Sequence, residues 1–369
     1  MRSKEVVVLG AGVVGCAAAY YLARDGANVT IVEREAVGSG ASGFAVGLLN
    51  PLMGSGIPGP MAPLAEQTFQ MHKDLWPEIE QASGVDLQTR ELPHLQLCFT
   101  DDELRQARVD MARWNASDGF SAEWLDPGQV CKLDPRISNL VAGAVLLRHI
   151  WILDSYRLTL ALLQSAETLG ATLINGEANG IESDGGQVTG VRVNDQTLAC
   201  DAVVIALGPW SGQALTGVEP ALPVAPLKGQ ILHLEAPTEP FRYHMAGPGQ
   251  VAQKADGLVW IASTEEEAGW DVTLTQAARD TLMARAVKMV PSLAELKIVR
   301  QTACLRPVTL DRQPIVGPLS GVAGAYLATG AEKKGILFGP IMGRAVADLV
   351  MSGKTALPIK PLSPQRLQR

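Results

Sequence analysis

The sequence has few residues of the kinds that build disulfide frameworks or metal sites. Its five cysteines are an odd, scattered set without a C-x-x-C pair, and its five histidines show no metal-ligand spacing. Such cysteines are typical of reduced thiols, most of which fill a core. We therefore expect no disulfide framework and no metal site.

Long apolar runs and an excess of positive charge are also missing. No run reaches the roughly 18 apolar residues that cross a bilayer, and the first apolar run, Val6–Leu9, has four residues before a glycine. That is too short for the core of a signal peptide. We therefore expect no membrane span and a cytoplasmic location. The formal net charge of −7 argues against nucleic acid as a main partner.

The composition is that of a folded protein with a large core. The 369 residues are 47% hydrophobic and 19% charged, which favours a globular chain over a disordered one. This length accommodates one large domain or two moderate ones.

The most informative stretch runs from Glu5 to Glu33. An apolar run is followed at once by Gly10-Ala11-Gly12-Val13-Val14-Gly15, then by an alanine-rich segment predicted to be a helix, a second strand and Glu33. This pattern is the fingerprint of a dinucleotide-binding site. Gly10 permits the tight turn, Gly12 lets the backbone approach a pyrophosphate, and Gly15 allows close packing of helix on strand. Glu33 is predicted to accept hydrogen bonds from a ribose diol.

A second glycine-rich segment, residues 38–51, follows the fingerprint. It is too long for a simple turn and too rich in small residues for a regular element. A flexible loop is one interpretation. Beside a dinucleotide fold we favour a segment whose backbone and hydroxyl groups come close to a large ligand.

An apolar strand at 200–207 that ends at Gly208 is predicted to return the chain to the nucleotide-binding sheet, and a further strand is expected at 325–328. Helices are expected at 63–83, 101–115, 156–169, 275–289 and 336–351. Arg306-Pro307 is expected to break a strand that starts at residue 298. The proline-rich residues 220–226 are interpreted as a crossing between domains, and the tail after Pro358 as loose.

Taken together, these motifs resemble the flavin-dependent amine and D-amino-acid oxidase family, most closely its glycine oxidase and sarcosine oxidase branch. The resemblance rests on the fingerprint with Glu33 and on residues 38–51, 201–211 and 306–337. It implies an α/β (α+β) fold, in which a mixed-sheet substrate domain is inserted into a glutathione-reductase-like, FAD-binding Rossmann domain. On this basis we assign residues 1–85, 140–215 and 300–369 to the FAD-binding domain, and residues 86–139 and 216–299 to the substrate domain.

The resemblance also implies FAD rather than NAD and places residues against it. Gly335, Ile336 and Leu337 fall where a helix N-terminus faces the N1–C2=O edge of the flavin, and the helix dipole stabilises negative charge there. The other predicted cofactor-binding residues are Gly10, Gly12, Val13, Val14, Gly15, Glu33, Arg34, Ala41, Ser42, Val46, Gly47, Leu48, Ala178, Gly208, Trp210, Arg306, Lys333 and Lys334.

For the substrate, the resemblance implies three catalytic candidates: Arg306, Lys333 and His244. Arg306 falls where the glycine oxidase branch keeps an arginine that clamps a carboxylate, a task that suits its planar fork. Ala331-Glu332-Lys333 stands where that branch has a His-x-Arg-like sequence, so Lys333 keeps the charge without the fork. His244 is a candidate base or substrate contact, with a structural role as the alternative. Cys304 aligns with the cysteine that binds flavin covalently in monomeric sarcosine oxidase, although a buried strand residue is the plainer interpretation.

We therefore predict an FAD-dependent oxidoreductase that oxidises the C–N bond of a small amino acid or N-substituted glycine. A hydride would pass from the α-carbon to flavin N5, and the imine product would hydrolyse. Oxygen or another acceptor would take the electrons; the lysine that sarcosine oxidases use for oxygen activation would fall near Val259 and is missing. The alternatives are a dehydrogenase with a quinone or protein acceptor, an NAD-dependent enzyme and a non-catalytic FAD-bearing subunit. A homo-oligomer is left open.

Overall fold

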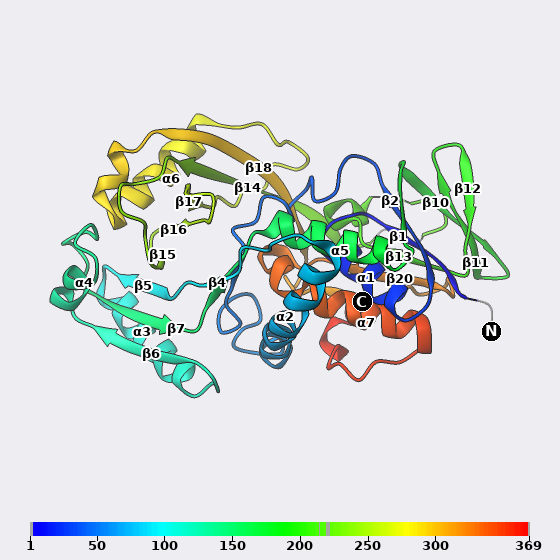
Figure 1. Ribbon diagram of the computed structural model, residues 1–369, viewed down its shortest axis with the longest axis horizontal. Coiled ribbons are helices and arrows are strands. Elements are labelled where there is room, and N and C mark those ends of the chain that lie inside the picture. Colours follow the sequence, from blue (N-terminus) through cyan, green and yellow to red (C-terminus); the bar gives the residue numbers. More distant parts are fainter. Residues whose placement is uncertain (1–2, 214, 219–221, 368–369) are drawn as a thin grey trace.

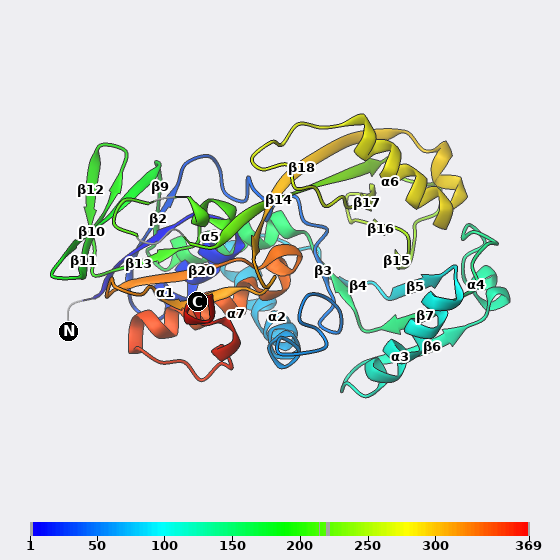
Figure 2. The same cartoon turned by 180° about the vertical axis from the view of Figure 1, so that it is seen from behind.

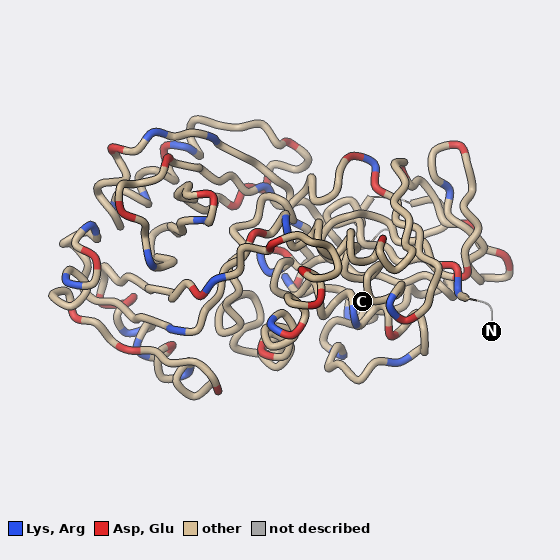
Figure 3. Tube along the Cα trace, viewed as in Figure 1, with Lys and Arg blue, Asp and Glu red and all other residues tan. Residues whose placement is uncertain are grey.

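The computed structural model describes residues 3–213, 215–218 and 222–367. Two large sheets lie at opposite ends of an elongated molecule, and the long strands of the second sheet reach back to the first (Figures 1 and 2). Acidic and basic residues are interspersed along the trace at both ends (Figure 3).

The first sheet has six strands and is parallel except at one edge. In spatial order its strands are β19 (Ile315–Pro318), β20 (Ala325–Thr329), β13 (Ala202–Ile205), β1 (Glu5–Leu9), β2 (Asn28–Glu33) and β9 (Thr172–Asn175). β19 runs antiparallel to β20, and the other neighbours are parallel. The apolar run Val6–Leu9 lies in its middle and is buried, because both faces of the sheet are covered.

Helices cover one face of this sheet and a small antiparallel sheet covers the other. Val6 and Val8 pack with α1 (Val13–Arg24), α2 (Ala62–Ser83), α5 (Ser155–Thr168) and α7 (Gly335–Ser352). Val7 and Leu9 pack on the opposite side with the hairpin region β10 (Ala178–Asp184), β11 (Gln187–Val193) and β12 (Gln196–Ala199). This alternation along β1 buries side chains on both faces, as a doubly covered strand requires.

The second sheet has eight strands and is mixed. In spatial order its strands are β18 (Ile298–Thr309), β14 (Val224–Leu234), β17 (Val259–Ala262), β16 (Gln250–Gln253), β15 (His244–Ala246), β5 (His94–Cys98), β7 (Gly143–Arg148) and β6 (Ser121–Leu125). β15 and β5 are parallel, and the other neighbours are antiparallel. Side chains of α4 (Pro127–Leu133) and α6 (Gln276–Met289) pack on one side and those of α3 (Asp101–Asn115) on the other.

Five of the predicted helices, α2, α3, α5, α6 and α7, are confirmed to within one residue at each end, and α1 begins within the glycine motif at Val13. A short sheet of β3 (Leu48–Leu49), β8 (Trp151–Ile152) and β4 (Arg90–Glu91) lies between the two large sheets. It contains part of the second glycine-rich segment, so this part of the segment is paired rather than free.

Two local predictions were wrong. β18 continues through Arg306-Pro307, because it is an edge strand, where a proline can be accommodated without loss of a ladder hydrogen bond. The tail after Pro358 is not loose: Leu362 is fully buried, and Arg366 forms an ion pair with Asp311 at 2.7 Å. Of the expected crossing at 220–226, residues 224–226 begin β14, and 220 and 221 lie outside the described residues.

The division of the chain into domains stays a prediction. The segment from residue 140, assigned to the FAD-binding domain, contains β7, and the boundary at residue 300 falls within β18. Both strands belong to the eight-stranded sheet.

Within the described part of the chain, one helical stretch, Glu332–Ser352, is long and apolar enough to cross a membrane. The most apolar 18 residues of this stretch are 67% buried inside the molecule, where α7 packs on α1 and α2. That burial is typical of a core helix. Four of the cysteines are buried free thiols and Cys131 is exposed.

Candidate active site

A cavity of about 690 Å³ extends from the fingerprint turn to the eight-stranded sheet. Every sequence-predicted site residue except Gly15 lines it: Gly10, Gly12, Val13, Val14, Glu33, Arg34, Ala41, Ser42, Val46, Gly47, Leu48, Ala178, Gly208, Trp210, His244, Arg306, Lys333, Lys334, Gly335, Ile336 and Leu337. The structure thus brings together residues from both ends of the sequence.

The fingerprint turn has the shape that its glycines allow. Gly10 has φ +97°, and a Cβ there would lie 2.7 Å from Ala206 O, so no other residue fits without a shift. Gly15 stands behind the turn, where a Cβ would lie 1.9 Å from Gly10 O. Glu33 is held at the end of β2 because its carboxylate accepts hydrogen bonds from the Ala11 and Glu35 amides, both at 2.9 Å.

The second glycine-rich segment is fixed against this turn. Gly38 N donates to Ala11 O at 3.0 Å, and the Ser42 hydroxyl accepts from Val13 N at 2.9 Å. Ser42 thereby caps the start of α1, which has no cap from its own N-cap glycine.

Lys254 holds the next part of this segment, a role that the sequence analysis missed. Its Nζ donates to Val46 O and to Leu153 O, both at 2.7 Å, and lies 4.0 Å from Asp154 Oδ2. Burial lowers the pKa of Lys254 to about 8. A lysine directly after a short strand carries no signal of such a role, because lysines in that position normally face solvent.

The start of α7 faces the cavity without a side-chain cap. The first amides of a helix have no intrahelical acceptor, so these N–H groups and the positive end of the dipole are available to a ligand oxygen. Gly335, Ile336 and Leu337 supply this helix start, as expected from the resemblance.

His72 of α2 supports the same helix start from behind and was also missed. Its Nε2 lies 3.0 Å from both Ile336 O and Leu337 O, while Trp76 Nε1 donates to its Nδ1 at 3.3 Å. Burial lowers the pKa of His72 to about 4, so the ring is neutral and Nε2 carries the proton. The sequence signal is Pro340, which lacks the N–H that would normally bond to Ile336 O four residues earlier.

Arg306 is buried in the wall formed by β18, β14 and β17. Its Nη1 donates to Thr264 O at 3.1 Å and its Nη2 to Ser263 Oγ at 2.8 Å. The guanidinium lies against the backbone of Gly229, where an added Cβ would be 2.0 Å from Nη2. Within the described residues Arg306 forms no ion pair.

Lys333 lies at the rim of the cavity, 44% exposed, and forms an ion pair with Glu265. Arg312 Nη1 lies 3.4 Å from Glu265 and 2.7 Å from Glu332, whose other oxygen accepts from Ser55 Oγ at 2.7 Å. Burial alone would raise the pKa of Glu265, but Lys333, Arg312 and, more weakly, the charge of Arg306 outweigh it and lower that pKa. The two carboxylates, Glu265 and Glu332, are therefore balanced by two cations, Lys333 and Arg312.

His244 is paired with His94, a partner that sequence reasoning did not identify. The two residues are in register on the parallel strands β15 and β5, and their Nδ1 atoms are 2.8 Å apart. Burial lowers the pKa of His94 to about 4 and that of His244 well below its usual value, so both rings are neutral. One shared proton joins them, and within the described residues neither Nε2 has a hydrogen-bond partner.

Cys304 lines the same wall as Arg306, two residues away on β18. Burial raises the pKa of its thiol, outweighing the charge of Arg306. A protonated thiol is a weak nucleophile, which favours the plain role of a buried strand residue. No group of His, Cys, Asp and Glu among the residues described could hold a metal ion.

The cavity fits a flavin dinucleotide. Its end near Glu33 also contains Arg34, whose guanidinium lies over the Trp210 ring at 4.5 Å, while the uncapped start of α7 stands beside the substrate-side wall that carries Arg306. The glycine turn predicted for a pyrophosphate, the acid predicted for a ribose and the helix start predicted for the flavin edge thus lie along one cavity. Fold and site together define a flavin-dependent oxidoreductase.

Comparison with known proteins gives the family. Residues 5–349 match the model of the DAO family, described as FAD dependent oxidoreductase, and the chain belongs to this family. The predictions of the family, of the fold class and of FAD as cofactor are confirmed, and the NAD-dependent alternative is set aside.

Relatives match over nearly the whole chain. The glycine oxidase of Pseudomonas aeruginosa is 30% identical over 369 residues, covering 98% of this chain and 99% of that protein. The glycine oxidase of Geobacillus kaustophilus is 29% identical over 364 residues, covering 97% and 96%. A crystal structure of glycine oxidase from Geobacillus kaustophilus matches with a TM-score of 0.91 at 28% identity, covering 99% of each chain.

Proposed function

We propose that this protein oxidises the C–N bond of a small amino acid or N-substituted glycine, by hydride transfer from the α-carbon to flavin N5, to give an imine that hydrolyses. The substrate is a small amine that carries a carboxylate. The observation that carries the proposal is Arg306, a buried guanidinium on the cavity wall that makes no ion pair among the described residues.

Arg306 is suited to receive a carboxylate. A guanidinium has five N–H groups, and two of those of Arg306 are used by Thr264 and Ser263. The remaining groups keep the planar fork that grips both oxygens of a carboxylate. Because the strand and Gly229 fix the guanidinium, a bound carboxylate would fix the α-carbon too, and orientation of this kind is a large part of catalysis.

The other residues define the electrostatics of the reaction. FAD, when bound, supplies the acceptor for two electrons and the transferred hydrogen. The start of α7 favours negative charge at the edge of the ring system that it faces. Arg306 and Lys334 add positive charge to the cavity, which favours the neutral form of a substrate amine, the form that can release its electron pair.

The roles of Lys333 and His244 stay predictions. Lys333 is ion-paired with Glu265 at the rim, so we infer an electrostatic contribution that solvent screens in part. His244 is neutral and bonded to His94, so we infer a substrate contact or base only through a movement of that pair. The cytoplasmic location, the electron acceptor and a homo-oligomer stay predictions as well.

Arg306→Lys tests the proposal. The variant keeps the charge but lacks the fork, and misplacing the reacting carbon by about 1 Å can cost on the order of 100-fold in rate. Anaerobic flavin reduction is measured with sarcosine and with dimethylamine, its decarboxylated analogue. We expect a large loss with sarcosine, little change with dimethylamine and a nearly normal flavin spectrum.

The matched control is Arg300→Lys, an exposed arginine of the same strand, which should behave as wild type. If Arg306→Lys reduces its flavin with amino acids as fast as wild type, the carboxylate clamp is wrong. If no amine reduces the wild-type flavin, the chain is a non-catalytic FAD-bearing subunit. Turnover with oxygen compared with turnover with a dye then separates an oxidase from a dehydrogenase.

A further inference from the structure

Lys334 is a second cation on the cavity wall, distinct from Arg306. It is the N-cap residue of α7, and its side chain crosses Gly54, where an added Cβ would lie 2.3 Å from Lys334 Cε. Its Nζ donates to Asn50 O at 2.8 Å. In the part of the chain that the structure describes, Lys334 forms no ion pair.

This is an unfavourable place for a positive charge. The N-terminus of a helix carries the positive end of its dipole, and cations are normally found at the other end. Burial, together with the charge of Lys333, lowers the pKa of Lys334 to about 8, which leaves the amine mostly protonated at neutral pH. The carboxylates of Glu332 and Glu265, which line or adjoin the same part of the chain, are paired with Arg312 and Lys333 instead.

Lys334 and Arg306 stand at different places in the cavity. Lys334 contacts the loop that contains Asn50 and Gly54. Its positive charge also adds to the effect of burial in lowering the pKa values of His94 and His244. Arg306 instead lies between β14 and β17, beside Ser263 and Thr264. The neutral histidines add no charge, so Lys334 and Arg306 are two cations of the cavity wall that form no ion pair within the described residues.

We propose that Lys334 binds a second anionic group of the substrate, so that the preferred substrates are amines with two carboxylates, one on Arg306 and one on Lys334. This inference rests on the proposed function and names its substrate class. An ammonium has three N–H groups, and one of those of Lys334 is used by Asn50 O. A carboxylate there would replace water around the half-buried ammonium and form charge-assisted hydrogen bonds.

The first test measures binding without reaction. The holoenzyme is titrated with diglycolate and with methoxyacetate. These two ethers are isosteres of iminodiacetate and sarcosine; they differ by one carboxylate and have no amine to oxidise. We expect wild type to bind diglycolate at least about tenfold more tightly, the value of one hydrogen bond to a charged group. Lys334→Met should lose this preference and bind methoxyacetate as wild type does.

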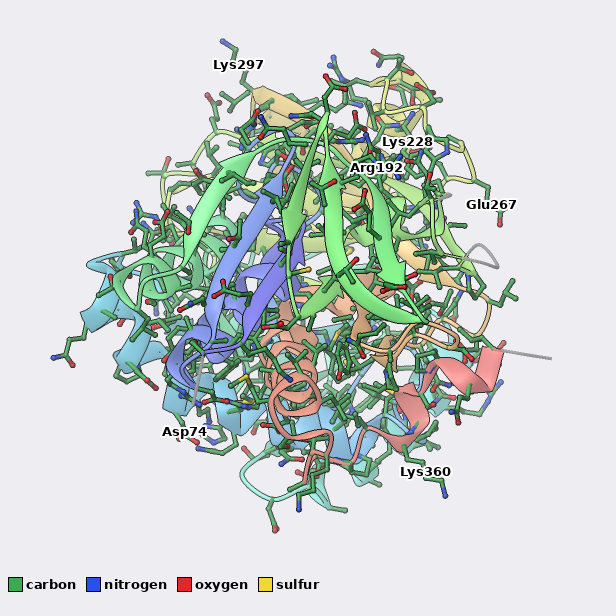
Figure 4. All side chains as sticks on the ribbon, turned by 90° about the vertical axis from the view of Figure 1, so that its right-hand side faces the viewer. Asp74, Arg192, Lys228, Glu267, Lys297 and Lys360 are labelled. Atoms are coloured by element: carbon green, nitrogen blue, oxygen red, sulfur yellow. The ribbon has the colours of Figure 1, made fainter. Side chains whose placement is uncertain are left out.

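Two further variants complete the comparison. Lys334→Arg keeps the charge and should keep most of the preference, and Lys334→Gln, which retains a donor for Asn50 O, should lose it even if Lys334→Met folds poorly. The control is Lys360→Met, since Lys360 is exposed and points away from the molecule (Figure 4). It should be indistinguishable from wild type.

The second test measures flavin reduction by iminodiacetate and by sarcosine. These two amines also differ by one carboxylate. The loss of rate caused by Lys334→Gln should be at least about tenfold larger with iminodiacetate than with sarcosine. Equal binding of the two ethers by wild type, or an equal loss with both amines in the variant, overturns the proposal and leaves Lys334 as a charge that acts on the flavin. If no amine reduces the flavin but the diglycolate preference depends on Lys334, the anion site stands and the proposed function fails.

Discussion

Replacing His72 by phenylalanine removes the donor that Pro340 makes necessary. In an unbroken helix the amide of residue 340 would bond to Ile336 O, and His72 Nε2 takes its place at 3.0 Å. The variant leaves this buried carbonyl without a donor, whereas Leu337 O keeps the Thr68 hydroxyl at 2.8 Å. An unsatisfied buried acceptor costs about 1–3 kcal/mol, so His72→Phe should lower the free energy of unfolding by about that amount.

Pro340→Ala provides the decisive second change, because alanine restores the missing N–H. In a double-mutant cycle, measured by urea denaturation of the holoenzyme, the loss caused by His72→Phe should shrink by roughly 1 kcal/mol or more in the Pro340→Ala background. Thr68→Val is the matched control: it removes a donor to Leu337 O, which Pro340 does not affect, so its effect should add to that of Pro340→Ala. Simple additivity for His72→Phe would refute the reasoning.

His72→Phe should also weaken FAD retention, because the same two carbonyls orient the first turn of α7 toward the cavity. Equilibrium dialysis of FAD from wild type and variant measures this. A variant that is less stable but holds FAD as tightly as wild type would show that the helix start is fixed by other contacts.

Other predictions follow from the same structure. Glu33→Gln should weaken FAD binding by roughly 1.5–3 kcal/mol, the value of a hydrogen bond to a charged group, and change the turnover of the loaded enzyme less; unchanged FAD affinity in a dialysis experiment would remove Glu33 from the site. His72, His94 and His233 each have a pKa lowered from 6.5 to about 4 by burial, so the unfolded chain binds more protons than the folded chain in this range. The stabilisation that these three neutral rings contribute is therefore fully present above pH 6.5 and is lost as the pH falls toward 4. A urea midpoint that stays constant over that window would contradict the neutral buried rings.

The sequence predicted best what depends on neighbouring residues. The fingerprint turn could be predicted because its glycines are required by the local backbone. Gly10 has a positive φ, and the backbone of Gly15 packs against Gly10 O. Helix positions were predicted well for a similar reason: Asp154, for example, caps α5 through a hydrogen bond to Arg157 N, three residues along the chain.

What the sequence could not show depends on partners far along the chain. His94 and His244 are 150 residues apart and meet only because β5 and β15 are neighbours in parallel register. Gly229 makes room for Arg306 from the facing strand β14. The break expected at Pro307 was wrong because a proline has a different effect on an edge strand, and a single sequence does not show which strand is at the edge. Lys254 carried no signal, since nothing local marks a lysine as buried, and Lys334 was placed at the cofactor only through the family resemblance.

The order of strands in the six-stranded sheet has a consequence for synthesis on the ribosome. β1 leaves the ribosome well before its neighbour β13, which comes at residue 202, and β13 is flanked on its other side by β20, which begins at residue 325. β2 can pair with β1 at once, but the other edge of the apolar strand Val6–Leu9 has no neighbour until β13 has been made, a period in which an exposed strand edge invites aggregation. The helix start at Gly335 follows β20, so the residues that line the flavin pocket are complete only after the last strand of this sheet has been made.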